Sequence, residues 1–239
     1  QNNPVYSTEI NGKQVTHIIL DEESVYAQYL PEVFPNAKFI VFLSRHSSQS
    51  GTPTLSVHTP GNFGIANLGG LSCQVSISPA KAMHTALQTM HRLVQETCLN
   101  YQVCYECTHH GPSLKIPTVF VELGSSLPQW GDQKAAAIVA QAAIDAIASF
   151  DDFPQQTAVI GIGGPHYNQK FSNYALTQKV FFSHMIPKYA IEHIDEEILL
   201  QCITRTHEKV NSVVLDWKGI KSENKPRLLD LLKKTALQI

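Results

Sequence analysis

The sequence predicts a single α/β domain, spanning residues 1–239, in which a mostly parallel sheet is flanked by helices. Short apolar runs alternate along the chain with runs of helical period, a pattern typical of parallel strands joined by crossover helices. Of the 239 residues, 43% are apolar and 16% are charged, so the chain can bury a substantial core. No internal repeat, low-complexity segment or linker divides it.

The N-terminal half contains three predicted strands and two helical segments. HIIL (17–20) and KFIVFL (38–43) are apolar enough to form buried strands, and a short helical segment around 24–30 separates them. TLSVH (54–58) predicts a third strand. From 80 to 98 the apolar residues recur at helical spacing on one face, which predicts an amphipathic helix.

The C-terminal half continues the alternation. Short apolar or alternating runs predict strands at 101–107, 118–123, 157–162, 179–182 and 212–216. A helix capped by Asp132 is expected to run to about residue 148, because an Asp side chain can accept bonds from the first free amides of a helix. Another helix is expected near 195–207, and Asn224 with Pro226 predicts the start of a closing amphipathic helix.

Composition limits the classes of function. The net charge is −2, so no overall positive field marks the chain as a non-specific nucleic-acid binder. Residues 205–239 hold eight Lys or Arg and four acids, which indicates either a solvated helix pair or a face that binds a phosphate backbone. Five cysteines without dense spacing argue against a disulfide framework and favour the cytoplasm. The most apolar stretch, 135–148, is too short to span a bilayer.

Histidines and one glutamate fall at the ends of five predicted strands. They are His46, the pair His109 and His110, Glu122, His166 and His184. Because ligands bind outside the carboxyl ends of parallel strands, we expect these side chains to share a site at one edge of the sheet. His58 ends another strand and is an intermediate case, whereas the remaining histidines fit surface or packing positions.

This set of side chains suits metal-assisted hydrolysis. Neutral imidazoles and carboxylates are the usual ligands of a catalytic Zn2+, and we expect His46, His109, His166 and His184 to supply them. A carboxylate that does not bind the metal, Glu122, would then act as the general base. No HExxH sequence is present, so a metal-free site with a histidine as acid and base stays open.

Two short motifs carry less information. Cys104 and Cys107 form a CxxC, but residues three apart on a strand point to opposite faces, so we expect two core cysteines. GIGGP (161–165) follows a strand without the spacing of a dinucleotide-binding motif. Its glycines, Gly163 and Gly164 among them, are expected to allow a tight turn and the close approach of a ligand.

An ordered set of motifs resembles the D-aminoacyl-tRNA deacylase family of archaea and plants. The motifs are SRHSS, SVHTPGNFG, ECTHHGP, TVFVELGSS and GIGGPHY, and the resemblance runs from about Tyr26 to the C-terminal helix. It implies a fold similar to peptidyl-tRNA hydrolases and nucleoside phosphorylases, zinc dependence, and hydrolysis of the ester between a D-amino acid and tRNA. The family begins with a further strand and helix, which we expect to be missing here.

The resemblance also implies roles for individual residues. Catalysis is assigned to Glu122, His109, His110 and Arg45, with Arg45, Asn62 and the 161–164 backbone as oxyanion donors. Ser47 and Ser48 are expected to contact the terminal ribose or phosphate. The acceptor stem is expected to lie on basic residues, which are Lys218, Lys221, Lys225 and Arg227. No obligatory protein partner is implied.

Two alternatives use the same residues differently. A zinc-dependent amidohydrolase or peptidase on the same scaffold would need the histidines but no RNA-binding face. A non-enzymatic RNA-binding module would need interleaved aromatic and basic residues, whereas only 8% of the chain is aromatic. That module would also leave the histidines at the strand ends unexplained.

Overall fold

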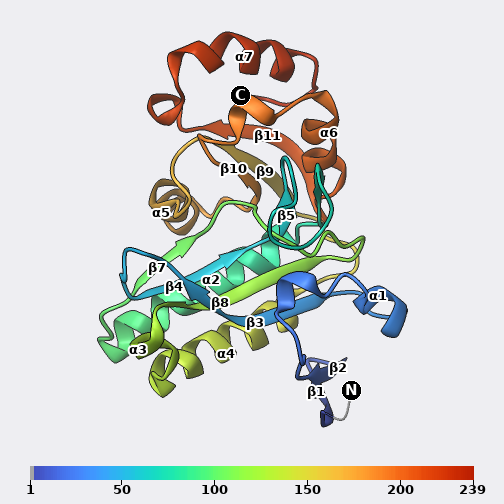
Figure 1. Ribbon diagram of the computed structural model, residues 1–239, viewed down its shortest axis with the longest axis vertical. Coiled ribbons are helices and arrows are strands. Elements are labelled where there is room, and N and C mark those ends of the chain that lie inside the picture. The colour runs from blue at the N-terminus through green and yellow to red at the C-terminus, as the bar shows by residue number, and fades with distance from the viewer. Residues whose placement is uncertain (1–2) are drawn as a thin grey trace.

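The computed structural model describes residues 3–239, and two sheets organise them (Figure 1). The larger sheet has the strand order β3-β8-β4-β7, and its strands are Ile40–Ser47, Thr118–Ser125, Thr54–His58 and Gln102–Tyr105. The smaller has the order β10-β9-β11, and its strands are Phe182–Ile186, Thr157–Ile162 and Lys209–Leu215. The prediction of an α/β fold is therefore confirmed.

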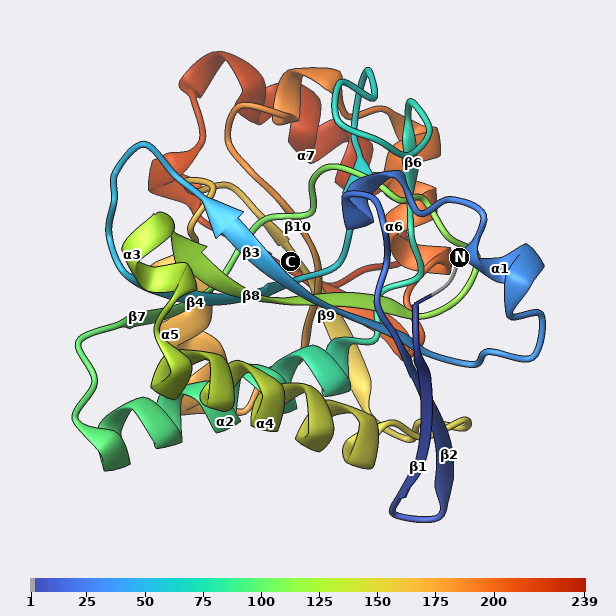
Figure 2. The same ribbon diagram turned by 60° about the horizontal axis from the view of Figure 1, so that its bottom comes forward.

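Two long helices cover one face of the larger sheet. α2 (Ala80–Thr97) and α4 (Gln133–Ser149) lie side by side beneath it in Figure 2. The predicted cap is confirmed, because the Asp132 side chain accepts bonds from the Lys134 and Ala135 amides. The core between helices and sheet is apolar and fully or nearly fully buried, and includes Met83, Leu87, Met90, Val119, Val121 and Leu123.

Three shorter helices surround the smaller sheet: α5 (Gln169–Gln178), α6 (Glu196–Thr204) and α7 (Lys225–Lys233) (Figure 1). α6 begins at Asp195, whose side chain accepts a bond from the Ile198 amide, and α7 begins with Pro226 in its first turn, as predicted. Within residues 3–239, no helix combines the length and the apolar character needed to cross a membrane.

The direction of the strands differs from the prediction of a mostly parallel sheet. The smaller sheet is wholly parallel, and β3 is parallel to β8. However, β4 pairs with β8 antiparallel and with β7 parallel. The carboxyl ends of β4 and β7 therefore lie opposite those of β3 and β8, so the predicted strand ends do not share one edge.

Two predicted strands are displaced. The 17–20 run is not a buried strand, because β2 (Lys13–Ile18) forms an exposed hairpin with β1 (Val5–Ile10), and Ile19 remains exposed. The strand predicted at 179–182 begins too early, because Lys179 takes a left-handed conformation that ends α5. The strand then begins at Phe182 and includes His184.

The imidazole of His84, in α2, makes the fold sensitive to acid. It is 3% exposed and packs edge-on against Phe181, and burial lowers its pKa from 6.5 to about 4. The unfolded chain therefore binds a proton at higher pH than the folded one, and stability falls as the pH drops from 6.5 to about 4. At about 1.4 kcal/mol per pKa unit, the loss is about 3 kcal/mol.

Urea unfolding at about pH 7 and about pH 4.5 measures this effect. His84→Leu should lose less stability between the two pH values than the unaltered chain. The exposed His193 provides the control, since His193→Gln should keep the full pH dependence. An unchanged pH dependence in His84→Leu would assign the acid sensitivity to other histidines.

Candidate active site

The candidate site lies on the face of the larger sheet that is turned away from α2 and α4. Side chains of β8 alternate between the two faces, so Val119, Val121 and Leu123 pack on the helices while Glu122 points the other way. In the strand register Glu122 lies between Ser44 of β3 and Ser56 of β4. The strands therefore place a carboxylate in the middle of a sheet face rather than at its edge.

Glu122 is held by side chains from both neighbouring strands. The Ser44 hydroxyl donates to its Oε1 at 2.5 Å, while its Oε2 lies 3.5 Å from His46 Nδ1 and 3.4 Å from His58 Nε2. Burial disfavours the charged carboxylate, but the close approach of the two histidines outweighs it and holds the pKa of Glu122 well below its usual range. Glu122 is therefore a buried anion within reach of two imidazoles.

A second buried carboxylate, Glu106, lies beside the first and was not predicted. Its side chain is 0% exposed, and its Oε2 lies 2.8 Å from His166 Nε2 and 3.5 Å from His109 Nε2. His46 Nδ1 lies 3.6 Å from the other oxygen, so His46 approaches both carboxylates. Burial raises the pKa of Glu106, but the bond to His166 together with the charges of His58 and His46 more than reverses this, leaving the pKa lowered.

His109 and His110 each use one ring nitrogen to bond the backbone. The Nδ1–H of His109 donates to the Cys107 carbonyl at 2.8 Å, and that of His110 donates to the Gly111 carbonyl at 2.7 Å. These bonds select the tautomer in which Nε2 carries a lone pair. Burial lowers the pKa of both rings, to about 4 for His110, so both are neutral ligands or bases.

His166 connects Glu106 to a thiol and a phenol. Its Nδ1 lies 3.3 Å from the Cys107 sulfur and 3.1 Å from the Tyr189 hydroxyl, which also contacts that sulfur at 3.3 Å. Burial opposes protonation of His166, but the contacts with Cys107 and Glu106 outweigh it and raise the pKa to about 10. Cys104 and Cys107 are both buried, as predicted, yet Cys107 also faces the site.

We call these side chains the histidine–carboxylate cluster, and they are His46, His58, Glu106, Cys107, His109, His110, Glu122 and His166. Within the described residues, three groups bring their ligand atoms within 4.8 Å of one another: His58 with His109 and His110, Cys107 with His109 and His166, and His46 with Glu106 and Glu122. Four buried atoms in the cluster lack a hydrogen-bond partner, namely both ring nitrogens of His58, Glu106 Oε1 and Glu122 Oε2. Unpaired buried polar atoms are costly, so this set fits a bound cation.

The segment 106–109 joins the two sheets at the cluster. The Glu106 amide donates to the Val57 carbonyl of the larger sheet at 3.1 Å. The next two amides turn to the other half of the molecule, since Cys107 donates to the His166 carbonyl at 2.9 Å and Thr108 to the Met185 carbonyl at 3.0 Å. Backbone bonds on both sides therefore position the side chains of 106–109.

His184, expected as a metal ligand, lies outside the cluster. It is fully buried inside β10, where its Nε2 bonds the Arg205 carbonyl at 2.9 Å and its Nδ1 lies 3.3 Å from the Thr108 hydroxyl. Burial lowers its pKa to about 4. With both ring nitrogens engaged, His184 is a core histidine that packs behind the site.

Four other predicted residues lie around the cluster rather than in it. Arg45 is mostly exposed, with its guanidinium 3.1 Å from Glu23 and stacked 5.1 Å from the Trp130 ring. Ser47 is exposed, and the Ser48 hydroxyl contacts the Ser50 hydroxyl at 3.1 Å. The Asn62 side-chain amide donates to the Gly69 carbonyl at 3.0 Å and so holds a loop together.

The glycines of GIGGP pack against the chain itself. Gly163 and Gly164 have φ values of 105° and 79°, and a β-carbon at Gly163 would approach the Asp216 carbonyl oxygen to 3.0 Å. One at Gly164 would meet Asn168 at 2.7 Å. The close approach expected of a ligand is therefore made by Asp216 and Asn168.

The predicted basic residues divide into two kinds. Arg227 donates to the backbone carbonyls of residues 191, 192 and 194, so it fixes that segment against α7. The Lys225 ammonium lies 4.5 Å from the Trp217 ring, and Lys221 lies 3.7 Å from Glu223. Lys218 is exposed, so the three lysines, and not Arg227, offer ammonium groups to a ligand.

Comparison with known proteins identifies the family. The family described as D-aminoacyl-tRNA deacylase matches residues 33–239. The D-aminoacyl-tRNA deacylase of Pyrococcus abyssi is 36% identical over 242 residues, covering 99% of this chain and 86% of the relative. That of Thermococcus kodakarensis is 38% identical over 229 residues, covering 93% and 81%.

A solved structure agrees with the fold. A crystal structure described as a conserved protein of unknown function matches with a TM-score of 0.84 and 25% sequence identity, covering 99% of this chain and 86% of that one. The relatives named above give no support to a peptidase or amidohydrolase. As its ordered motifs predicted, the chain belongs to the D-aminoacyl-tRNA deacylase family.

Proposed function

We propose that this chain hydrolyses the ester of D-aminoacyl-tRNA at the histidine–carboxylate cluster and releases the free D-amino acid and tRNA. Membership of the deacylase family supports the substrate. The main support for placing the reaction at this cluster is its pair of buried carboxylates, Glu106 and Glu122. Each faces imidazoles and each has an oxygen without a hydrogen-bond partner. Acyl transfer to water needs such a base in a site that excludes bulk water. The cytoplasm, where aminoacyl-tRNA is made and used, is the proposed place of action.

We infer that the cluster holds Zn2+. The donor atoms are imidazole nitrogens, carboxylate oxygens and one thiol, a set that zinc prefers, and several of them are buried without a partner. The His109 and His110 rings, whose Nδ1–H groups are tied to carbonyls, present Nε2 as ligand atoms, and His58 completes their group. When bound, zinc would lower the pKa of a water molecule towards about 7.

Glu122 is the proposed general base. One of its oxygens is occupied by the Ser44 hydroxyl, which orients the carboxylate, and the other has no hydrogen-bond partner and can accept a proton from water. Glu106 instead neutralises His166, and we assign it the role of orienting His166 and His46. His110, neutral at physiological pH with its Nδ1–H bonded to the Gly111 carbonyl, serves as a zinc ligand and not as a proton acceptor.

Release of tyrosine from matched D- and L-tyrosyl-tRNA tests the proposal. We expect hydrolysis of the D-ester well above that of the L-ester, loss of activity with a chelator, and recovery on addition of zinc. If the chelator has no effect on hydrolysis, the proposed deacylase activity stands and the proposed zinc site is contradicted. Absence of hydrolysis of both esters by a folded, zinc-loaded chain would contradict the function itself.

A further inference from the structure

A basic cavity lies next to the histidine–carboxylate cluster. It has a volume of about 320 Å³, and its lining includes Lys188, Tyr189, Lys218 and Lys221, which we call the lysine pocket. Lys188 and Tyr189 follow β10, and the other two follow β11. The pocket therefore lies outside the carboxyl ends of a parallel sheet, where α/β proteins bind their ligands.

The charge of the lysine pocket favours a phosphate. Three lysines line it against one acidic residue, Glu192. All three lysines belong to exposed residues, and only Lys221 has an acidic partner, at 3.7 Å, among the described ion pairs. Three cations on one concave surface attract a polyanion such as a nucleic-acid backbone.

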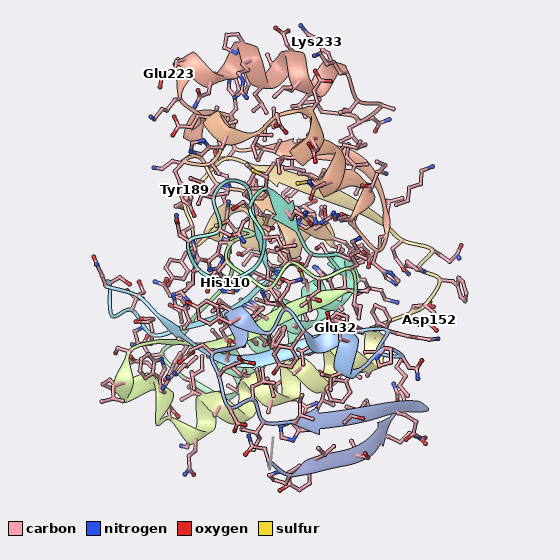
Figure 3. All side chains as sticks on the ribbon, turned by 45° about the vertical axis from the view of Figure 1, so that its right-hand side comes forward. Glu32, His110, Asp152, Tyr189, Glu223 and Lys233 are labelled. Carbon is pink, nitrogen blue, oxygen red and sulfur yellow. The ribbon has the colours of Figure 1, made fainter. Side chains whose placement is uncertain are left out.

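Tyr189 links the pocket to the cluster. Its hydroxyl lies 3.1 Å from His166 Nδ1, while its ring lines the pocket and the residue stays 53% exposed. Figure 3 shows Tyr189 between His110 of the cluster and Glu223 near α7. One tyrosine side chain thus separates the reacting centre from the lysines, and its exposed ring is a surface on which a base can stack.

We propose that the lysine pocket binds the unpaired 3′ end of the tRNA, with backbone phosphates on Lys188, Lys218 and Lys221 and a base on the ring of Tyr189. This inference rests on the proposed function. A paired acceptor stem would present only phosphates, because bases inside a duplex cannot stack on a side chain. The presence of an exposed aromatic ring beside the lysines therefore selects the single-stranded end.

Comparison of a long and a short ester tests the inference. D-tyrosyl-tRNA carries the phosphates, whereas D-tyrosyl-adenosine has the same ester and no internucleotide phosphate. In the triple variant Lys188→Gln, Lys218→Gln and Lys221→Gln, we expect kcat/KM for the tRNA to fall at least about tenfold more than for the adenosine ester, mainly through KM. The salt dependence of tRNA binding should weaken, with a slope smaller by about 0.7 per lost contact and about 2 in total.

A matched triple variant controls for net charge. Lys115, Lys134 and Lys209 are exposed and lie on other elements, so their replacement by Gln removes the same charge elsewhere. Equal losses in the two triple variants would overturn the inference, as would equal losses on the two esters. If the unaltered chain hydrolyses neither ester, the proposed function fails instead, which is a separate outcome.

Stacking has its own test. The probe is the unacylated tetranucleotide RNA with the sequence of the tRNA 3′ terminus, bound to the full chain. Tyr189→Leu should bind it about tenfold more weakly than Tyr189→Phe, because only the latter keeps a ring. Equal affinities of the two variants would show that no base lies on Tyr189 and would overturn that part of the inference.

Discussion

Glu122→Gln is expected to slow the hydrolysis of D-tyrosyl-tRNA by about a hundredfold to ten-thousandfold, the range over which a general base contributes. The amide keeps the shape of the side chain and can still accept from Ser44, but it cannot take a proton from water. It also removes the negative charge that His46 and His58 face at 3.5 Å and 3.4 Å. Single-turnover hydrolysis with saturating enzyme measures the chemical step without product release.

The control for this variant is Glu197→Gln, which replaces an exposed glutamate in the first turn of α6. We expect it to hydrolyse the ester at the unaltered rate. A near-native rate in a folded Glu122→Gln chain would assign the proton transfer to another group, with Glu106 the next candidate because its Oε1 has no hydrogen-bond partner. Thermal unfolding of both variants separates loss of chemistry from loss of fold.

Glu106→Gln is expected to damage both stability and activity. Glu106 is wholly buried and lies 2.8 Å from His166 Nε2, so the change leaves an imidazolium without its counter-charge. Breaking one side of a buried ion pair costs about 3–5 kcal/mol. Glu106 also faces His46 and His109 at 3.6 Å and 3.5 Å, and ligands that lose such a partner bind metal about tenfold to a hundredfold more weakly. Zinc titration and urea unfolding of the same sample measure the two effects.

The double variant Glu106→Gln with His166→Gln separates these effects. With neither charge present, we expect part of the lost stability to return, while zinc binding and hydrolysis stay low. If the double variant is as unstable as the single one, the pair is not the source of the loss. Full activity in Glu106→Gln would contradict any role of Glu106 in the site.

Much of the fold follows from local patterns in the sequence. Alternating strands and helices, the Asp132 cap and the position of Pro226 are local signals, and the structure reproduces them. The direction of β4 is a different matter, because strand polarity depends on how a connection crosses the sheet. The exposed N-terminal hairpin carries its own signal, the Asn11–Gly12 turn, which favours two-residue hairpin loops.

The candidate site was predictable in its histidines and not in its second carboxylate. His46, His109, His110 and His166 were predicted from strand ends, and the antiparallel β4 still brings His58 to them on the sheet face. Glu106 lies in a sequence that alternates between apolar and polar residues, and this pattern predicts a strand whose polar side chains, including Glu106, face the solvent. Its burial results from a bridge to Tyr167 in the loop between β9 and α5, a contact between residues far apart in sequence.

The backbone hydrogen bonds of segment 106–109 mean that its conformational entropy is lost during folding and not during substrate binding. The Glu106 amide is bound to the larger sheet, the Cys107 amide to the loop that follows β9, and the Thr108 amide to β10 of the smaller sheet. Fixing each residue costs about 1–2 kcal/mol of conformational entropy, and these bonds place that cost in folding. The backbone that carries Glu106, Cys107 and His109 is therefore already ordered when the substrate binds. The binding energy of the substrate is then available for aligning the ester with the attacking water.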